Sequence, residues 1–141
     1  MSQSIKPQQD IELVGGEHCV LMLHGLGASP LELSRLAKDL NLAGFSVFAP
    51  SIPNYSFGTE CGDWQDWVEH AEQYLWDLRP QYTTVSVVGL SMGATLSMAL
   101  AQRESLTGLV LLSTALAYDG WAIPWYSFLL NFASWLPFAN R

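Results

Sequence analysis

The feature that most constrains the fold is the pentapeptide GLSMG, residues 89–93, which joins two segments of different character. The residues before it include three valines at 85, 87 and 88, as a buried parallel strand requires. The residues after it, ATLSMAL, have the composition of a helix. Because so sharp a turn brings the backbones on its two sides almost into contact, we expect Gly89 and Gly93 to be required there. Ser91 would then point its hydroxyl into open space.

Short apolar runs alternate with amphipathic segments along the rest of the chain. We expect strands at residues 18–24, 45–49, 85–88 and 108–114, the last of them buried like the others. Helices are expected to begin at Ser29, at Asp63 and directly after Ser91. Strands and helices in alternation with short loops predict an α/β fold with three layers, α/β/α, and a mostly parallel sheet.

Start and stop signals support the first two helices. Ser29 is expected to be an N-cap, with Pro30 at the first helical position and Glu32 as the acid of a capping box, and Gly44 to end that helix. The second helix is expected to end before Pro80. Its apolar face comprises Trp64, Trp67, Val68, Ala71, Leu75 and Leu78. Residues 50–62, rich in Pro, Gly, Ser and Asn, are expected to form a loop that can border a site.

Composition excludes several classes of function. The formal net charge is −7 and the six Lys and Arg residues form no cluster, which argues against a nucleic-acid partner. Cys19 and Cys61 lie far apart, so we interpret both as reduced thiols and expect no metal site and no cofactor. Residues 1–16 are polar and lack the apolar stretch of a secretory signal, which makes a cytoplasmic location the expectation. The sequence indicates no particular oligomeric state.

A serine hydroxyl needs a histidine to accept its proton and an acid to orient that histidine. All three histidines, His18, His24 and His70, precede Ser91, whereas a strand–turn–helix nucleophile is followed in the chain by its acid and then its histidine. We therefore give none of the three a catalytic role. Asp119 is a minority candidate for the acid, and its simpler interpretation is a turn residue beside Gly120.

The HGLG sequence, residues 24–27, ends the first expected strand at a loop. An oxyanion hole needs two backbone N–H groups directed at the developing charge. The expected donors are Leu26, which follows HG, and Met92, which follows the serine. Gly25 is expected to shape this loop as Gly89 and Gly93 shape the turn.

Four segments, LHGLGASP, FSVFAP, DWVEHAEQYL and VVGLSMGATL, together resemble the α/β-hydrolase fold, especially its bacterial carboxylesterase and monoacylglycerol-lipase-like members. The resemblance runs from about His18 to Thr114. It implies that Ser91 is the nucleophile and that Leu26 and Met92 are the oxyanion donors. It also implies an acid and a histidine further along, which this sequence does not contain. Residues 1–141 are thus expected to be the N-terminal part of a single domain, with its core at 18–114 and an incomplete C-terminal side.

Residues 119–141 interrupt the alternation, since 121–139 carry no charge and are rich in aromatic side chains. We interpret them as the start of an apolar cap or lid, which would favour an ester with a hydrophobic acyl group. The second interpretation is an interfacial element that contacts a membrane surface. The third is a membrane helix, which Pro124 and Pro137 disfavour.

The expected function is therefore that of a serine ester hydrolase, a carboxylesterase or lipase-like enzyme, acting through an acyl-enzyme on a small-molecule ester or lipid-like substrate. Without the acid and the histidine, the chain as given is expected to be inactive. One alternative is a non-catalytic hydrolase-like module that binds a lipid or a partner. Another is a thioesterase or peptidase of the same fold.

Overall fold

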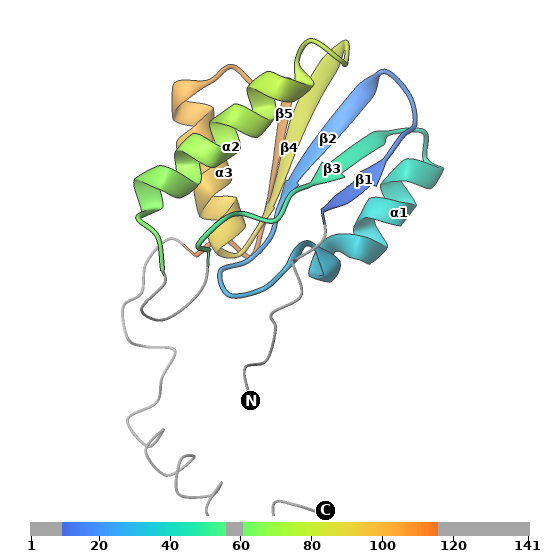
Figure 1. Ribbon diagram of the computed structural model, residues 1–141. Helices are drawn as coiled ribbons and strands as arrows, with labels where there is room; N and C mark the ends of the chain where they lie inside the picture. The colour runs from blue at the N-terminus through green and yellow to red at the C-terminus, as the bar shows by residue number, and fades with distance from the viewer. Residues whose placement is uncertain (1–9, 56–60, 116–141) are drawn as a thin grey trace, which may run out of the picture.

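The computed structural model describes residues 10–55 and 61–115 (Figure 1). Their centre is a five-stranded sheet with the strand order β1-β3-β2-β4-β5. The strands are β1 (Ile11–Leu13), β2 (His18–Leu23), β3 (Ser46–Ala49), β4 (Thr84–Leu90) and β5 (Gly108–Leu112). β1 pairs with β3 antiparallel, and every other pairing is parallel. The predicted class, a mostly parallel α/β sheet, is confirmed.

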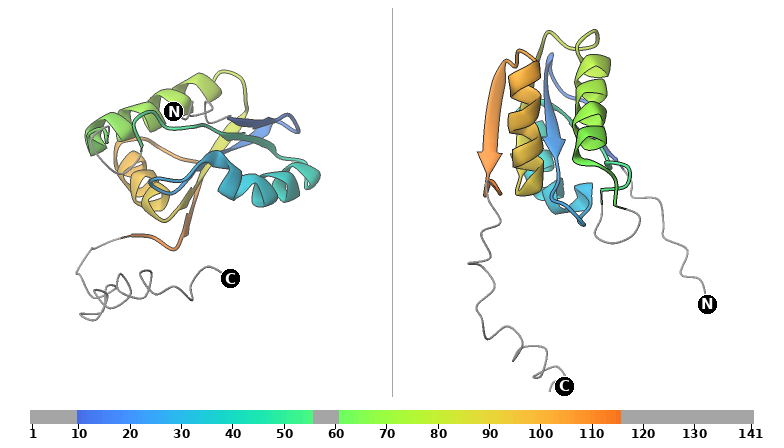
Figure 2. Two further views of the ribbon diagram at one scale, coloured as in Figure 1. Left: turned by 60° about the horizontal axis from the view of Figure 1, so that its bottom comes forward. Right: turned by 90° about the vertical axis from the view of Figure 1, so that its left-hand side faces the viewer.

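Helices cover both faces of the sheet (Figures 1 and 2). They are the 3₁₀ helix η1 (Pro30–Leu33) and the α-helices α1 (Ser34–Leu42), α2 (Trp64–Leu78) and α3 (Met92–Arg103). α2 and α3 pack on one face against Cys19, Leu21 and Leu23 of β2. η1 and α1 pack on the other face against Val20 and Met22 of the same strand. Successive residues of β2 thus enter opposite cores, which is why this strand is apolar throughout.

Local signals located two helices well. Asp63 caps α2 by accepting a hydrogen bond from the Gln65 N–H at 3.3 Å, as predicted. α1 ends at Leu42 with Ala43 as its C-cap, and Gly44 follows with a φ of +98°, a conformation that favours glycine. Most of the expected apolar face of α2 is buried. Trp64 is the exception: it is the first residue of the helix, and 53% of it is exposed.

Ser29 is the N-cap of a helix with Pro30 at its first position, as predicted, but that helix is the 3₁₀ helix η1, and the α-helix begins only at Ser34. The expected capping box is wrong in its acid. The carboxylate of Glu32 accepts a hydrogen bond from the Gly25 N–H and not from the cap residue. The local pattern assigned this carboxylate to the helix end, but it binds Gly25, which lies outside the helix.

Two features of the sheet differ from expectation. β1 was not predicted, because its three residues form a strand only by pairing with β3. β5 was predicted to be buried, yet Leu109, Val110 and Leu111 are 38%, 49% and 37% exposed. Its position explains this, since in the described part of the chain β5 lies at the sheet edge and pairs only with β4.

Both cysteines are free thiols: Cys19 is buried and Cys61 is exposed. Burial, with a smaller contribution from the charge of Glu12, raises the pKa of Cys19 to about 11. Within residues 10–55 and 61–115, no helix combines the length and apolarity needed to cross a bilayer.

Candidate active site

Ser91 occupies a one-residue turn between the end of β4 and the start of α3. Its φ of 56° and ψ of −117° are an unfavourable combination for a residue with a Cβ, and the side chain is exposed. Four hydrogen bonds hold this backbone: the Ser91 N–H donates to the Leu112 carbonyl at 2.8 Å, and its carbonyl accepts from the N–H groups of Ala94, Thr95 and Ala115. The serine is thus presented on a strained but fixed backbone.

The two glycines of the pentapeptide lie where no side chain fits. A Cβ on Gly93 would lie 2.1 Å from the carbonyl oxygen of Leu23 at the end of β2. A Cβ on Gly89 would lie 2.3 Å from the carbonyl oxygen of Gly93 and 2.4 Å from Oγ of Ser97. These contacts allow the first turn of α3 to approach both β4 and β2, which brings Ser91 close to the loop that follows β2.

His24, at the start of that loop, is fully buried and both of its ring nitrogens are engaged. Nδ1 is 2.9 Å from the Gly25 carbonyl oxygen, and Nε2 is 3.3 Å from the backbone nitrogen of Ile52. Because the Ile52 N–H can only donate, Nε2 must be the acceptor and Nδ1 must carry the proton. Burial lowers the pKa of His24, although its bond to Gly25 and the charge of Glu32 oppose this. The ring is therefore a neutral brace of the loop.

The Gly25 carbonyl sets the direction of the Leu26 N–H. It accepts hydrogen bonds from the His24 ring and from the Ala28 N–H at 3.1 Å. No peptide bond in the described residues is cis, so the Leu26 N–H points away from this carbonyl. Gly27 has a φ of 73° and donates its N–H to the Tyr55 carbonyl at 3.2 Å. Residues 50–55 thus brace the 24–27 loop at two points, as a loop bordering a site would.

The loop and the serine turn lie side by side at the carboxyl ends of β2 and β4, where Leu23 is in register with Gly89. A Cβ built on Gly25 would lie 3.7 Å from Cβ of Ser91. Within the described residues, the N–H groups of Leu26 and Met92 donate no hydrogen bond. The Met92 N–H belongs to the first residue of α3, where helix N–H groups have no partner within the helix and favour an anion.

The other two histidines lie elsewhere. His18 begins β2, at the end of the sheet opposite Ser91, and its Nδ1 is 2.6 Å from Oγ1 of Thr84. His70 is on α2 and stacks on Tyr74. The described structure therefore places no histidine in position to accept a proton from Ser91. Asp119 and the expected cap at 119–141 lie outside the described residues.

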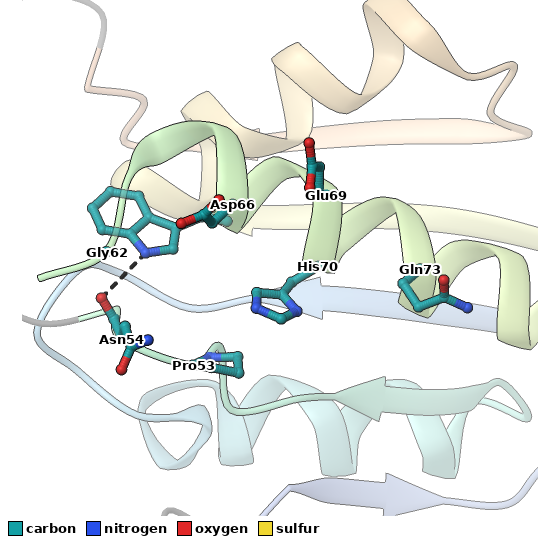
Figure 3. Close-up of a pocket in the computed structure, with 8 residues that line it drawn as sticks. Pro53, Asn54, Gly62, Asp66, Glu69, His70 and Gln73 are labelled. Atoms are coloured by element: carbon teal, nitrogen blue, oxygen red, sulfur yellow. Dashed lines mark hydrogen bonds between the residues drawn. The ribbon is translucent and has the colours of Figure 1, made fainter.

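A cavity of about 430 Å³ lies between α2 and the loop that follows β3 (Figure 3). It is lined by Pro53, Asn54, Gly62, Asp66, Trp67, Glu69, His70 and Gln73. The Trp67 indole N–H donates to the Asn54 carbonyl at 3.2 Å, which is the dashed line in Figure 3. Ser91, Leu26 and Met92 do not line this cavity, so it is separate from the serine turn. Within the described ranges, no group of three or more His, Cys, Asp or Glu side chains could hold a metal ion.

Three residues that shape this region were not singled out from the sequence, Gly27, Ile52 and Tyr55, and a fourth, Glu32, was assigned to a helix cap instead. Only Gly27 carried a usable signal, as the second glycine of HGLG. The others act through contacts between residues distant in the chain, which local patterns do not reveal.

Comparison with known proteins identifies the family of this chain. Residues 20–141 match the model of the alpha/beta hydrolase family. The chain is 34% identical over 103 residues to a thermostable monoacylglycerol lipase of Bacillus sp. (strain H-257), an alignment covering 68% of this chain and 40% of that protein. It is 28% identical over 102 residues to a carboxylesterase of Bacillus subtilis (strain 168), covering 68% of this chain and 41% of the relative.

The fold is also that of a solved structure, the monoacylglycerol lipase of Paleococcus ferrophilus. The TM-score is 0.68 at 23% identity, over 94% of this chain and 51% of the other. The alignments with the two Bacillus proteins span about 40% of their lengths. The family match covers most of the sequence, so this chain belongs to the alpha/beta hydrolase family.

Proposed function

We propose that Ser91 is the nucleophile of a serine ester hydrolase and that the N–H groups of Leu26 and Met92 form its oxyanion hole. The observation that carries this proposal is the turn at Ser91, where an exposed serine with a φ of 56° stands beside two N–H groups that donate no hydrogen bond in the described residues. Unfavourable backbone conformations persist where the surrounding structure fixes them, and they cluster at functional sites.

The chemistry follows from these groups. Ser91 Oγ attacks the carbonyl carbon of an ester while a base takes its proton, and the carbonyl oxygen becomes an oxyanion between the Leu26 and Met92 N–H groups. Collapse of this intermediate breaks the bond to the alcohol, which leaves with a proton, and the acyl group stays on Ser91. Water then attacks the acyl-enzyme by the same route and releases the acid.

We infer that residues 1–141 are the N-terminal part of a single hydrolase domain. The sequence has no histidine after Ser91, and the alignments with the Bacillus relatives span only about 40% of those proteins. The base and the acid would come from residues beyond 141, so the chain alone would have little activity. Removing triad members leaves only a residual rate, on the order of 10³–10⁴ above water.

The favoured substrate is an ester with a hydrophobic acyl group. The uncharged segment 121–139 would supply an apolar cap over Ser91, and each buried methylene of an acyl chain contributes about 0.8 kcal/mol. The two Bacillus relatives are named as a monoacylglycerol lipase and a carboxylesterase, and both names denote hydrolysis of carboxylic esters. Contact of 121–139 with a membrane surface would serve the same substrates by bringing the enzyme to lipid.

The test uses the full-length protein, expressed from the complete gene, and a series of p-nitrophenyl esters from acetate to decanoate. We expect hydrolysis, an increase of kcat/KM with acyl length, and a loss of at least about 10³-fold in Ser91→Ala. Ser105→Ala, the same substitution at an exposed serine beyond the end of α3, is the control and should keep wild-type turnover. Hydrolysis that persists in Ser91→Ala would reject the proposal.

The position of the histidines favours a second candidate, a hydrolase-like module that binds a lipid or a partner without turnover. This candidate requires that the full-length protein bind medium-chain monoacylglycerol without cleaving it. Binding and hydrolysis measured on the same preparation separate the two functions. Parallel assays with an acyl thioester and a peptide amide would detect a thioesterase or a peptidase of the same fold.

A further inference from the structure

Glu32 reaches across from η1 to the loop beside Ser91. Its Oε1 accepts a hydrogen bond from the backbone N–H of Gly25, seven positions earlier in the chain. Gly25 is buried, whereas Glu32 is exposed. The carboxylate of an exposed residue thus satisfies the backbone N–H of a buried one. The sequence assigned this acid to a helix cap, and the structure assigns it to the candidate oxyanion loop.

The bond completes a clamp on both sides of Gly25. Glu32 holds its N–H, while the His24 ring and the Ala28 N–H hold its carbonyl. A glycine has more backbone freedom than any other residue, so its φ and ψ are fixed here only by what its two peptide groups bind. The peptide group after Gly25 contains the Leu26 N–H, and its direction depends on both restraints.

Resting on the function proposed above, we propose that Glu32 is a positioning residue that fixes the Leu26 N–H in the direction of the oxyanion. It acts through Gly25 and does not touch the substrate. An oxyanion-hole donor acts on the charge that develops in the transition state, so a loss of alignment lowers kcat more than it raises KM.

Glu32 holds the loop through a hydrogen bond, while its charge works against the reaction. A Cβ built on Gly25 would lie 3.2 Å from Oε1 of Glu32 and 3.7 Å from Cβ of Ser91, so carboxylate and serine flank the same small space. A negative charge this close repels an oxyanion. The useful part of Glu32 is therefore its acceptor oxygen, and a glutamine can supply that oxygen without the charge.

The test compares Glu32→Ala, Glu32→Gln and Glu32→Asp in the full-length protein, with p-nitrophenyl butyrate as substrate. Losing one oxyanion donor outright costs about 10²–10³ in turnover, so misdirecting one in Glu32→Ala should lower kcat about 10- to 100-fold, with KM within about twofold. Glu32→Gln should keep kcat within about threefold of wild type. Glu32→Asp, whose carboxylate is one methylene shorter, should fall between them. Asp39→Ala, which removes an exposed carboxylate from α1, is the matched control and should leave kcat unchanged.

A second readout separates positioning from general stability. An alkyl boronic acid forms a tetrahedral adduct on a nucleophilic serine, so its inhibition constant should rise in Glu32→Ala in proportion to the fall in kcat. If Glu32→Ala does not fold, as judged by circular dichroism, the test is the comparison of kcat between Glu32→Asp and Glu32→Gln. Normal kcat in Glu32→Ala, or a Glu32→Gln as slow as Glu32→Ala, would overturn the inference. Should Ser91→Ala keep full activity, the proposed function fails instead, whatever Glu32 does.

Discussion

Replacing Gly93 by alanine tests whether the close approach of α3 to β2 is real. Gly93 is buried in the first turn of α3, and the added Cβ would lie 2.1 Å from the Leu23 carbonyl oxygen and 2.5 Å from the His24 carbonyl oxygen. Real Cβ atoms essentially never approach closer than 3.0 Å. Both obstructing atoms belong to backbone, so no change of rotamer can relieve the contact.

The expected cost follows from these distances. The start of α3 and the end of β2 would have to separate by roughly 1 Å, in a core where overpacking costs about 1–3 kcal/mol and occasionally more. Alanine in a helix returns up to about 1 kcal/mol relative to glycine. Because both obstructing atoms belong to backbone, we expect the overpacking cost to lie at the upper end of this range. The free energy of unfolding should therefore fall by about 2 kcal/mol or more.

The assay is urea unfolding of the full-length protein, followed by tryptophan fluorescence and analysed at constant m. Gly25→Ala is the matched control, because its Cβ would lie 3.2 Å from the Glu32 carboxylate and in ordinary van der Waals contact with Cβ of Ser91 at 3.7 Å and the Leu90 carbonyl oxygen at 3.8 Å. We expect this control to lose less than about 1 kcal/mol, since a flexible side-chain end can move aside. A Gly93→Ala protein as stable as the control would refute the packing described for the serine turn.

Three further outcomes are expected. Tyr55→Phe should be neutral or stabilising by up to about 1 kcal/mol in urea unfolding, because the buried Tyr55 hydroxyl has no hydrogen-bond partner among the described residues; a clear loss would show that a partner exists. Ser97→Ala should lose about 1 kcal/mol in the same assay, because the buried Ser97 hydroxyl donates to the Gly93 carbonyl at 2.7 Å; an unchanged midpoint would contradict this. Burial lowers the pKa of His24, so its neutral form contributes full stability above about pH 6.5, and this contribution is lost as pH falls through the lowered pKa. Thermal unfolding at pH 7.5 and pH 5.5 should show this loss in wild type and a smaller one in His24→Asn; equal losses would exclude His24 as the source.

The sequence alone predicted those features of the structure that depend on residues close together in the chain. Asp63 at a cap and Gly44 after a helix are required by local backbone geometry, so their patterns could be interpreted directly. The glycines two residues either side of Ser91 were expected from the sharp turn, and the contact that requires Gly93 is with the Leu23 carbonyl of β2. The parallel pairing of most of the sheet could be predicted from strands that alternate with helices.

What could not be predicted depends on contacts between distant residues. β1 exists only through its pairing with β3, and the exposure of β5 reflects its place at the sheet edge. The clamp on Gly25 joins it to Glu32, and the loop brace joins His24 to Ile52. Glu32 is instructive, since Ser29 and Glu32 have the spacing of a capping box and the carboxylate nevertheless bonds elsewhere.

The most direct measurement is to trap the acyl-enzyme on Ser91. The full-length protein would be mixed with p-nitrophenyl butyrate, quenched in acid within the first turnovers, digested and analysed by mass spectrometry. We expect one butyryl group on the peptide that contains Ser91, and no adduct in Ser91→Ala. Hydrolysis of the ester with no adduct on that peptide, or with an adduct that survives in Ser91→Ala, would contradict the assignment of Ser91 as the nucleophile.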